Sequence, residues 1–497
     1  MSDIGNGTNH PLLLRGARRL GDAVTVDVLV RDGRVAALGP DLADVAGPRA
    51  EHVPLDGRTV MPGLWDAHVH LTQWALARQR LDLAGATSAA HAVTLVRARL
   101  DAGLPPAGTP LVGFGFRDGL WPDAPTSALL DAAVGDVPVV LVSGDLHCAW
   151  LSTAGLRLLG VGAHPTGLLR EGEWLPLQGV VDHVSDDVAD ALVHDAAVHA
   201  ASLGVVGVVD LEIADNLYVW RRRAAARPGV VRVRAGVWED WLDRVVHDDL
   251  HTGDRVAGLV EQGPLKVITD GSLNTRTAYC HDAYPGTTDH GVLAVPPERL
   301  VPLMSSAHAH GLRCAIHAIG DAANALALDA FATTGAAGSV EHAQLLTDDD
   351  VARFAALGVV ASVQPEHAMD DRDVADRHWA GRTGRAFPYG ALHAAGVRLA
   401  LGSDAPVAPL DPWTAIDAAV WRARDGRDAW HPEQRLDLTA ALAASVDGRP
   451  LSLRVGDPAD LAVLDDDPLT RGTTPGALRS TPVAGALVAG TWTHHTL

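Results

Sequence analysis

The amino-acid sequence predicts an α/β protein built on a closed (β/α)8 barrel, with a small β-sandwich domain assembled from both chain ends. Strand-like and helix-like segments alternate through the middle of the chain and give eight βα units, the count that such a barrel requires. Both ends are instead rich in short strands separated by turns. The length of 497 residues suggests one large domain and a smaller one.

The two ends have the same character. The expected strands at the ends are Pro11–Leu14, Ala23–Arg31, Arg34–Leu38, Arg58–Val60, Asp460–Leu464 and Val483–Val488. Asp32-Gly33 and Asp56-Gly57 are hairpin signals between successive N-terminal strands. We therefore expect residues 1–61 and 446–497 to form the β-sandwich domain together.

The barrel is expected over residues 62–445. Its first strand opens at Leu64, and the others are expected at Gly204–Leu211, Val231–Val237, Leu265–Thr269, Arg313–His317, Ser339–His342, Val359–Val363 and Arg398–Gly402. Segments of helical period, such as Ala322–Thr333 and Asp348–Leu357, lie between them. A doubly wound open sheet is the alternative, but no Gly-rich phosphate loop follows the first strand.

Residues 72–200 are too many for one crossover between neighbouring strands. They contain a further expected strand, Val137–Ser143. We expect this segment to be an insertion after barrel strand one that lies over the barrel mouth.

Charge and cysteine content limit the classes of partner. A formal net charge of −21 disfavours nucleic acid and anionic membranes. Cys148, Cys280 and Cys314 are far apart, which fits a reducing cytoplasm and excludes a thiolate metal cluster. No apolar run approaches the roughly 20 residues of a membrane span, and no long apolar signal region opens the chain. We expect a cytoplasmic protein that acts on a small molecule. Whether it forms a homodimer is left open.

Lysine occurs once. Of 40 basic residues, 39 are arginine, and the exception is Lys266. Its neighbours Leu265, Val267 and Ile268 predict a buried strand, where an unpaired cation is costly. Arginine stays protonated, whereas a buried lysine can lose its proton and react. One such reaction adds CO2 and gives a carbamate that can bridge two metal ions. A lysine surviving by chance on a solvated loop is the alternative, and the apolar neighbours favour a chemical role.

The motif Asp66-Ala67-His68-Val69-His70 provides two imidazoles. In a strand, residues i and i+2 point to the same side, so His68 and His70 can face one metal ion. Three other strands end in His317, His342 and Asp404. Taken singly, each is better explained as a satisfied core histidine or a helix N-cap aspartate than as a metal ligand. Together with Lys266 they fall on strands one, four, five, six and eight, and barrel enzymes place catalytic groups at strand ends.

These motifs give the chain a family resemblance. It resembles the amidohydrolase superfamily, and within it the YtcJ-like branch (amidohydrolase family 3) that includes N-substituted formamide deformylase. The matching segments are MPGLWDAHVH, LDLAGATS, LKVITDGSLNTRTA, IHAIGDAAN, VEHAQ, ASVQPEH, LGSDAPV and GDPADLAVLD. The sequence departs from the common pattern of the branch at Asn274-Thr275 and Ala322, near the expected pocket, so no substrate is carried over.

The resemblance implies a distorted TIM barrel with a metal centre. His68 and His70 would bind the first metal ion, and His317 and His342 the second. Lys266, as a carbamate, would bridge both ions, and Asp404 would complete the first site. Nitrogen and oxygen ligands without thiolate make two zinc ions the default.

Hydrolysis of a C–N bond, in an amide or an N-substituted formamide, is the simplest reaction that this ligand set supports. Metal-held hydroxide would attack the carbonyl carbon. Asp404 would take the water proton and deliver it to the leaving nitrogen. The residues expected to line the substrate pocket are Asp270, Ser272, Arg276, His147, Gln364 and His367. For Arg276 the alternative is pairing with Asp270, and for His147 it is a structural role.

Other functions stay open at this point. A mononuclear zinc deaminase of a cyclic amine or amidine needs the histidines and the strand-eight aspartate but no bridging lysine. A non-catalytic amidohydrolase-like binding protein would usually have lost ligands, and here the full set is present. Schiff-base chemistry at Lys266 leaves the histidines unexplained.

Overall fold

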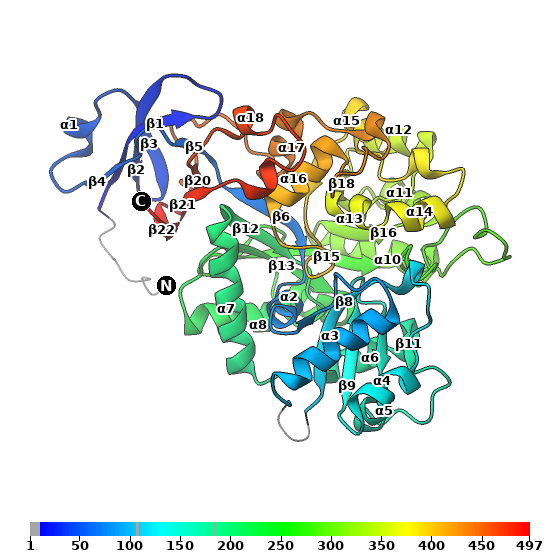
Figure 1. The fold of residues 1–497 in the computed structure, drawn as a ribbon. Helices are drawn as coiled ribbons and strands as arrows, with labels where there is room; N and C mark the ends of the chain where they lie inside the picture. The colour runs from blue at the N-terminus through cyan, green and yellow to red at the C-terminus, as the bar shows by residue number, and fades with distance from the viewer. Residues whose placement is uncertain (1–9, 106–108, 182–183) are drawn as a thin grey trace.

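The structure is a computed structural model that describes residues 10–105, 109–181 and 184–497. It contains a nine-stranded, an eight-stranded and a five-stranded sheet (Figure 1). The N-terminal strands, blue in Figure 1, lie beside the C-terminal strands, red in the same view. None of the helices in the described ranges is long and apolar enough to cross a membrane.

The predicted barrel is confirmed, and all eight expected strands are present. In chain order they are β6 (Leu64–Val69), β12 (Val205–Asp210), β13 (Arg232–Trp238), β15 (Val260–Ile268), β16 (Cys314–Ala318), β17 (Gly338–His342), β18 (Val360–Val363) and β19 (Leu399–Leu401). Neighbours pair in parallel, and the short β14 (Arg255–Ala257) adds an antiparallel edge to β15. Apolar residues dominate the strands because helices cover their outer side.

The barrel closes where β6 meets β19, through a few contacts instead of a full ladder. Val69 and Ala405 form an isolated parallel bridge. The backbone N–H of Asp404 donates to the carbonyl of His68 over 2.7 Å. The closure therefore fixes the separation of two candidate metal ligands.

Asp66 and Gly402 support this closure of the barrel. The carboxylate of Asp66 accepts the backbone N–H of Ser403 at 3.0 Å and that of His68 at 3.0 Å. Gly402 lets the two strands approach, because a Cβ there would lie 2.7 Å from the backbone nitrogen of His68.

Helices cover the outside of the barrel. They are α7 (Asp186–Ser202), α8 (Asn216–Ala226), α9 (Glu239–His247), α10 (Pro297–Ala309), α11 (Asp321–Thr334), α12 (Asp348–Leu357), α13 (Pro365–Asp370), α14 (Arg372–His378), α15 (Tyr389–Ala394), α16 (Pro412–Trp421) and α17 (Leu438–Ala444). The two helices expected at Ala322–Thr333 and Asp348–Leu357 are confirmed as α11 and α12. A capping box between Thr347 and Asp350 begins α12, and Gly358 in the left-handed conformation ends it.

Both chain ends contribute to the eight-stranded sheet, as predicted. Its strands are β1 (Leu12–Arg19), β2 (Thr25–Arg31), β3 (Arg34–Gly39), β4 (Glu51–Pro54), β5 (Thr59–Pro62), β20 (Leu461–Leu464), β21 (Val483–Val488) and β22 (Thr491–His495), with α1 (Ala43–Ala46) and α18 (Pro468–Arg471) in the connections. Asp32 and Gly33 form the β2–β3 hairpin turn with positive φ, as predicted. The hairpin prediction at Asp56-Gly57 was wrong: β4 and β5 both run parallel to β1, so this turn passes from one partner strand to the next.

The segment after β6 begins with α2 (Leu71–Ala77) and then forms the five-stranded sheet. The strands are β7 (Leu81–Asp82), β8 (Leu111–Phe116), β9 (Val139–Ser143), β10 (Cys148–Leu151) and β11 (Leu168–Arg170), and the helices are α3 (Ala89–Asp101), α4 (Ser127–Val134), α5 (Thr153–Leu158) and α6 (Leu175–Val181). The expected strand Val137–Ser143 is confirmed as β9. At the end of the segment, α7 packs against α2 and β12.

We predict that Gly402→Ala destabilises the barrel by about 1–3 kcal/mol, because the new methyl group collides with backbone that cannot move away cheaply. Thermal and denaturant unfolding would measure the loss. Gly384→Ala is the matched control, since no atom lies within 4 Å of the position of its Cβ. Equal stability of the two variants would contradict this account of the closure.

Candidate metal centre

All six predicted metal ligands meet at the carboxyl end of the barrel. His68 lies in β6 and His70 directly after it, while Lys266, His317 and His342 lie in β15, β16 and β17, and Asp404 follows β19. Each of them is buried. All six line one cavity of about 380 Å³. The positions deduced from strand ends therefore come together in space.

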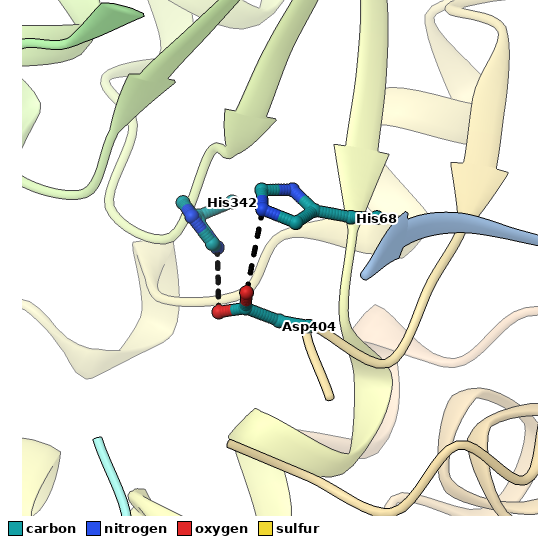
Figure 2. Close-up of side chains that lie close together, drawn as sticks. All are labelled: His68, His342 and Asp404. Atoms are coloured by element: carbon teal, nitrogen blue, oxygen red, sulfur yellow. Dashed lines mark ion pairs between the residues drawn. The ribbon is translucent and has the colours of Figure 1, made fainter. Parts of the chain in front are cut away.

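Asp404 lies at the centre of this group. Its Oδ1 is 3.3 Å from Nε2 of His68 and 3.3 Å from Nε2 of His70. Its Oδ2 is 4.0 Å from Nδ1 of His342, and Figure 2 shows the carboxylate between the rings of His68 and His342. Ligand atoms of these three residues all lie within 4.8 Å of one another. Nζ of Lys266 is 3.4 Å from Nε2 of His68.

Several buried ring nitrogens here have no hydrogen-bond partner among the described residues. They are Nδ1 of His70, Nε2 of His317 and Nε2 of His367. A buried polar atom without a partner is costly, and native proteins rarely leave one. Imidazole nitrogens and carboxylate oxygens are the ligand atoms that zinc and related cations coordinate. The residues present thus fit a divalent metal centre.

The charge states also suit metal binding. Burial lowers the pKa of His317 and of His342 well below the ordinary histidine value, and Lys266 adds to this at His317. Both rings are therefore neutral near pH 7, as metal ligands must be. Burial acts to raise the pKa of Asp404, but His68 and the bond from His70 outweigh it and hold the pKa well below its usual range. Asp404 is therefore ionised.

The charge of Lys266 is also altered. Burial lowers the pKa of Lys266 to about 8 against the attraction of Glu341 and Asp404. An amine with that pKa is neutral in about one molecule in ten at pH 7. Neutral amine is the form that can react with CO2.

Two side chains behind the cavity orient ligand rings. Oε2 of Glu341 lies 2.7 Å from Nδ1 of His68, and Oε1 of Gln364 lies 2.8 Å from Nδ1 of His342. Both oxygens accept, so in each ring Nδ1 carries the proton and Nε2 keeps its lone pair. Such partners fix tautomer and orientation in metal sites. Sequence reasoning assigned no role to Glu341, although it directly precedes His342.

The predicted pocket residues divide into three groups. Asp270, Ser272, His147 and His367 line the cavity. Gln364 is buried and contacts the cavity only through His342. Arg276 is exposed and is not among the lining residues. Asp270 accepts backbone N–H groups of Tyr279, Ile319 and Gly320, which accounts for its buried carboxylate without Arg276.

Sequence reasoning missed other polar residues of the cavity wall. They are Gln73, Arg117, Asp145, Glu171, Gln178, Thr277, Gln344 and Asp371. Most of them come from the insertion, which therefore lies at the barrel mouth as predicted. The apolar part of the wall is aliphatic and includes Leu146, Leu175, Ile213, Leu273, Val292, Ile319 and Val407.

Comparison with known proteins agrees with this geometry. A family model described as "Amidohydrolase family" matches residues 51–492, almost the whole described chain. The chain belongs to the amidohydrolase family. Within it, the chain is a member of the YtcJ-like branch, amidohydrolase family 3. The amidohydrolase match covers the barrel, the insertion and the terminal sheet from β4 onward, and it leaves out β1, β2 and β3.

The similarity to individual relatives extends over most of the length of both proteins. The chain is 29% identical to YtcJ of Bacillus subtilis over 80% of each protein. It is 27% identical to N-substituted formamide deformylase of Arthrobacter pascens, over 93% of this chain and 94% of that protein. Among solved structures, a metal-dependent hydrolase of Pyrococcus horikoshii is 27% identical, with a TM-score of 0.78 over 94% of this chain and 99% of the other. This amidohydrolase is thus a metal-dependent hydrolase by family.

We predict that Glu341→Gln weakens metal binding by about 10- to 100-fold, because the neutral amide no longer makes His68 a more basic ligand. Metal content after dialysis against a graded series of chelator concentrations would measure this. Glu261→Gln is the control, since Glu261 lies in β15 and pairs with Arg234 outside the cavity. Unchanged metal retention in Glu341→Gln would show that Glu341 does not support the site.

Proposed function

We propose that this amidohydrolase cleaves a C–N bond of a small amide or N-substituted formamide, using two divalent metal ions, zinc by default. The observation that carries the proposal is that the neutral imidazoles of His317 and His342, the ionised carboxylate of Asp404 and a lysine of lowered pKa surround one cavity. The name of the Arthrobacter relative supports the bond type.

Six residues would hold the ions. His68, His70 and Asp404 would take one ion, His317 and His342 the other, and Lys266 would bridge them as a carbamate. When bound, such ions supply a strong nucleophile from water near neutral pH and polarise the carbonyl group. The position of Lys266 beside His68 favours this arrangement over a single-ion deaminase, which has no use for a lysine.

Asp404 has the position and charge of a general base. Its carboxylate is ionised and lies between imidazoles at the cavity wall. It would take the proton of the attacking water as the carbon–oxygen bond forms. Its burial by the surrounding ligands keeps bulk water from competing for that proton.

The wall of the cavity suggests the substrate. Its apolar side chains are aliphatic, and no Phe, Tyr or Trp of the described chain lines it. Such a wall gains free energy by burying an apolar substituent, about 25 cal/mol per Å². We therefore expect a neutral amide that carries an apolar group, and N-alkylformamides are suitable first probes.

Metal removal tests the proposed function. Protein stripped with a chelator should lose its hydrolysis of N-alkylformamides to background and regain it with two equivalents of Zn²⁺ per chain. Formate and amine release would be followed directly. Full activity of the stripped protein, or one ion per chain with release of ammonia from a cyclic amidine, would contradict it.

Lys266→Arg tests the bridging role. We expect the ion count to fall from two to one per chain and kcat to fall about 100-fold or more, because a guanidinium cannot form a carbamate. Arg299→Lys, a surface exchange beside Glu239, is the control and should keep both ions. Since neutral amine increases as pH rises toward about 8, reactivation of stripped, CO2-depleted wild-type protein by Zn²⁺ and CO2 should be faster at pH 8 than at pH 6.5. A fully active arginine variant would refute the bridge.

A further inference from the structure

A histidine and a glutamate of the insertion form a pair at the wall of the metal-site cavity. Nδ1 of His147 lies 3.0 Å from Oε2 of Glu171, and both residues line the cavity. His147 follows β9, and Glu171 opens the short 3-10 helix after β11. Neither belongs to the barrel that supplies the metal ligands.

The glutamate of this pair is held in place from its other side. Its Oε1 accepts the hydroxyl of Thr275 at 2.9 Å and that of Thr277 at 2.8 Å. Its backbone N–H donates to the carbonyl of His147 at 2.9 Å. The carboxylate is thus fixed by the loop after β15, and its orientation is set before any substrate enters.

The orientation of the imidazole follows from this bond. A carboxylate can only accept, so Nδ1 of His147 carries a proton and Nε2 is the nitrogen left for the cavity. Asp145 lies on the other side and accepts the backbone N–H of His147 at 3.1 Å. Oδ2 of Asp145 also accepts the hydroxyl of Ser272 at 3.1 Å, which ties this turn to the barrel loop.

Its surroundings favour a protonated ring. Burial acts to lower the pKa of His147, but the bond from Glu171 and the charges of Asp145 and Glu171 outweigh it and raise the pKa to about 9. Asp404 acts in the same direction. His147 in turn acts on a candidate metal ligand. Burial lowers the pKa of His317 most, the charge of Lys266 comes next, and the charge of His147 is the third contribution. His147 is therefore within electrostatic reach of the metal ligands.

The other cation of the insertion in this cavity is already engaged. Arg117 donates to Asp370 at 2.8 Å and to the carbonyl of Val407 at 3.0 Å. Lys266 belongs to the ligand group. Burial also raises the pKa of two other lining carboxyls, Asp270 and Asp371, to about 7. Asp270 accepts three backbone N–H groups, and Asp371 lies 3.8 Å from Arg117. His147 is thus the cation of the insertion that combines an ordered position in the described cavity wall with a proton to give.

We propose that His147, oriented by Glu171, is the catalytic acid that protonates the nitrogen leaving the substrate. In this step the Nε2–H bond breaks and an N–H bond forms as the C–N bond breaks, with its electron pair passing to nitrogen. The imidazole then takes a proton from solvent, and the water proton held by Asp404 is released to solvent. Asp404 acts as base and His147 as acid. His147 thus takes over the proton delivery to nitrogen that was expected of Asp404, and neither group must reverse its role within one turnover. The inference rests on the proposed amide hydrolysis.

Leaving-group dependence tests the acid. We expect His147→Gln to lower kcat by ~100- to 1000-fold on an N-alkylformamide, whose amine must be protonated to leave. On N-(4-nitrophenyl)formamide, whose amine leaves more readily, the loss should be about tenfold or less. The ion count per chain should not change. Equal losses on both substrates, or loss of metal, would show a structural role and overturn the proposal.

A second pair in the same insertion provides the matched control. His164 lies 3.6 Å from Glu173 and neither residue lines the cavity. His164→Gln should leave both rates unchanged. Glu171→Gln keeps the shape of the positioning residue and removes its charge, so the alkaline limb of the kcat profile should move to lower pH by about one unit or more.

A measurement without substrate separates this proposal from the proposed function. In zinc-loaded protein with isotope-labelled histidine, the signal lost in His147→Gln identifies the ring, and its titration reports the charge. We expect a protonated ring at pH 7 in the wild type and a neutral one at pH 8 in Glu171→Gln. A ring that is neutral at pH 7 in the wild type overturns the acid role, whatever the substrate. If the ring is protonated at pH 7 but the protein hydrolyses neither formamide, the substrate class is rejected instead.

Discussion

The structure depends on polar groups that are buried together at one point. The neutral imidazoles of His317 and His342 meet the ionised carboxylate of Asp404 and the side chain of Lys266 at the carboxyl end of the barrel. Nε2 of His317 has no hydrogen-bond partner in the described chain. In a folded protein such atoms cost about 1–3 kcal/mol each. A divalent cation bound by this group would turn Nε2 of His317 from a cost into a ligand, so we expect metal binding to be coupled to folding.

The frame that holds these groups is built from backbone and buried partners. Asp66 and Gly402 bring β6 and β19 together, which fixes His68 relative to Asp404. Glu341 and Gln364 then set the ring orientations from behind. A ligand placed on a strand and oriented by a second side chain loses little freedom when it binds a metal, and this explains why the site uses strand ends and not loop tips.

The sequence was sufficient for the barrel and for its ligand positions because both follow local rules. Buried parallel strands are continuous apolar runs, and a polar residue that ends such a run marks the barrel mouth. In the terminal sheet β4 and β22 escaped prediction, because they are short and mostly exposed or half-buried, with no apolar run to indicate them. The edge strand β14 and the insertion strands β7, β8, β10 and β11 were not predicted either. The turn at Asp56-Gly57 has hairpin chemistry, but the strands on its two sides pair with β1, which is distant in the sequence, and no local pattern contains that pairing.

The cavity wall was less predictable, for a different physical reason. Asp145 and Glu171 acquire their roles from contacts with Ser272, Thr275 and Thr277, more than a hundred residues away in the chain. The barrel side of each contact lies in a motif that carries the family resemblance, whereas the insertion side has no spacing rule. The candidate metal ligands thus come from the strand ends, whereas the insertion supplies much of the wall together with His147. Changes in the insertion can alter which substrate fits without moving a candidate metal ligand, so a relative that shares the barrel need not share the substrate.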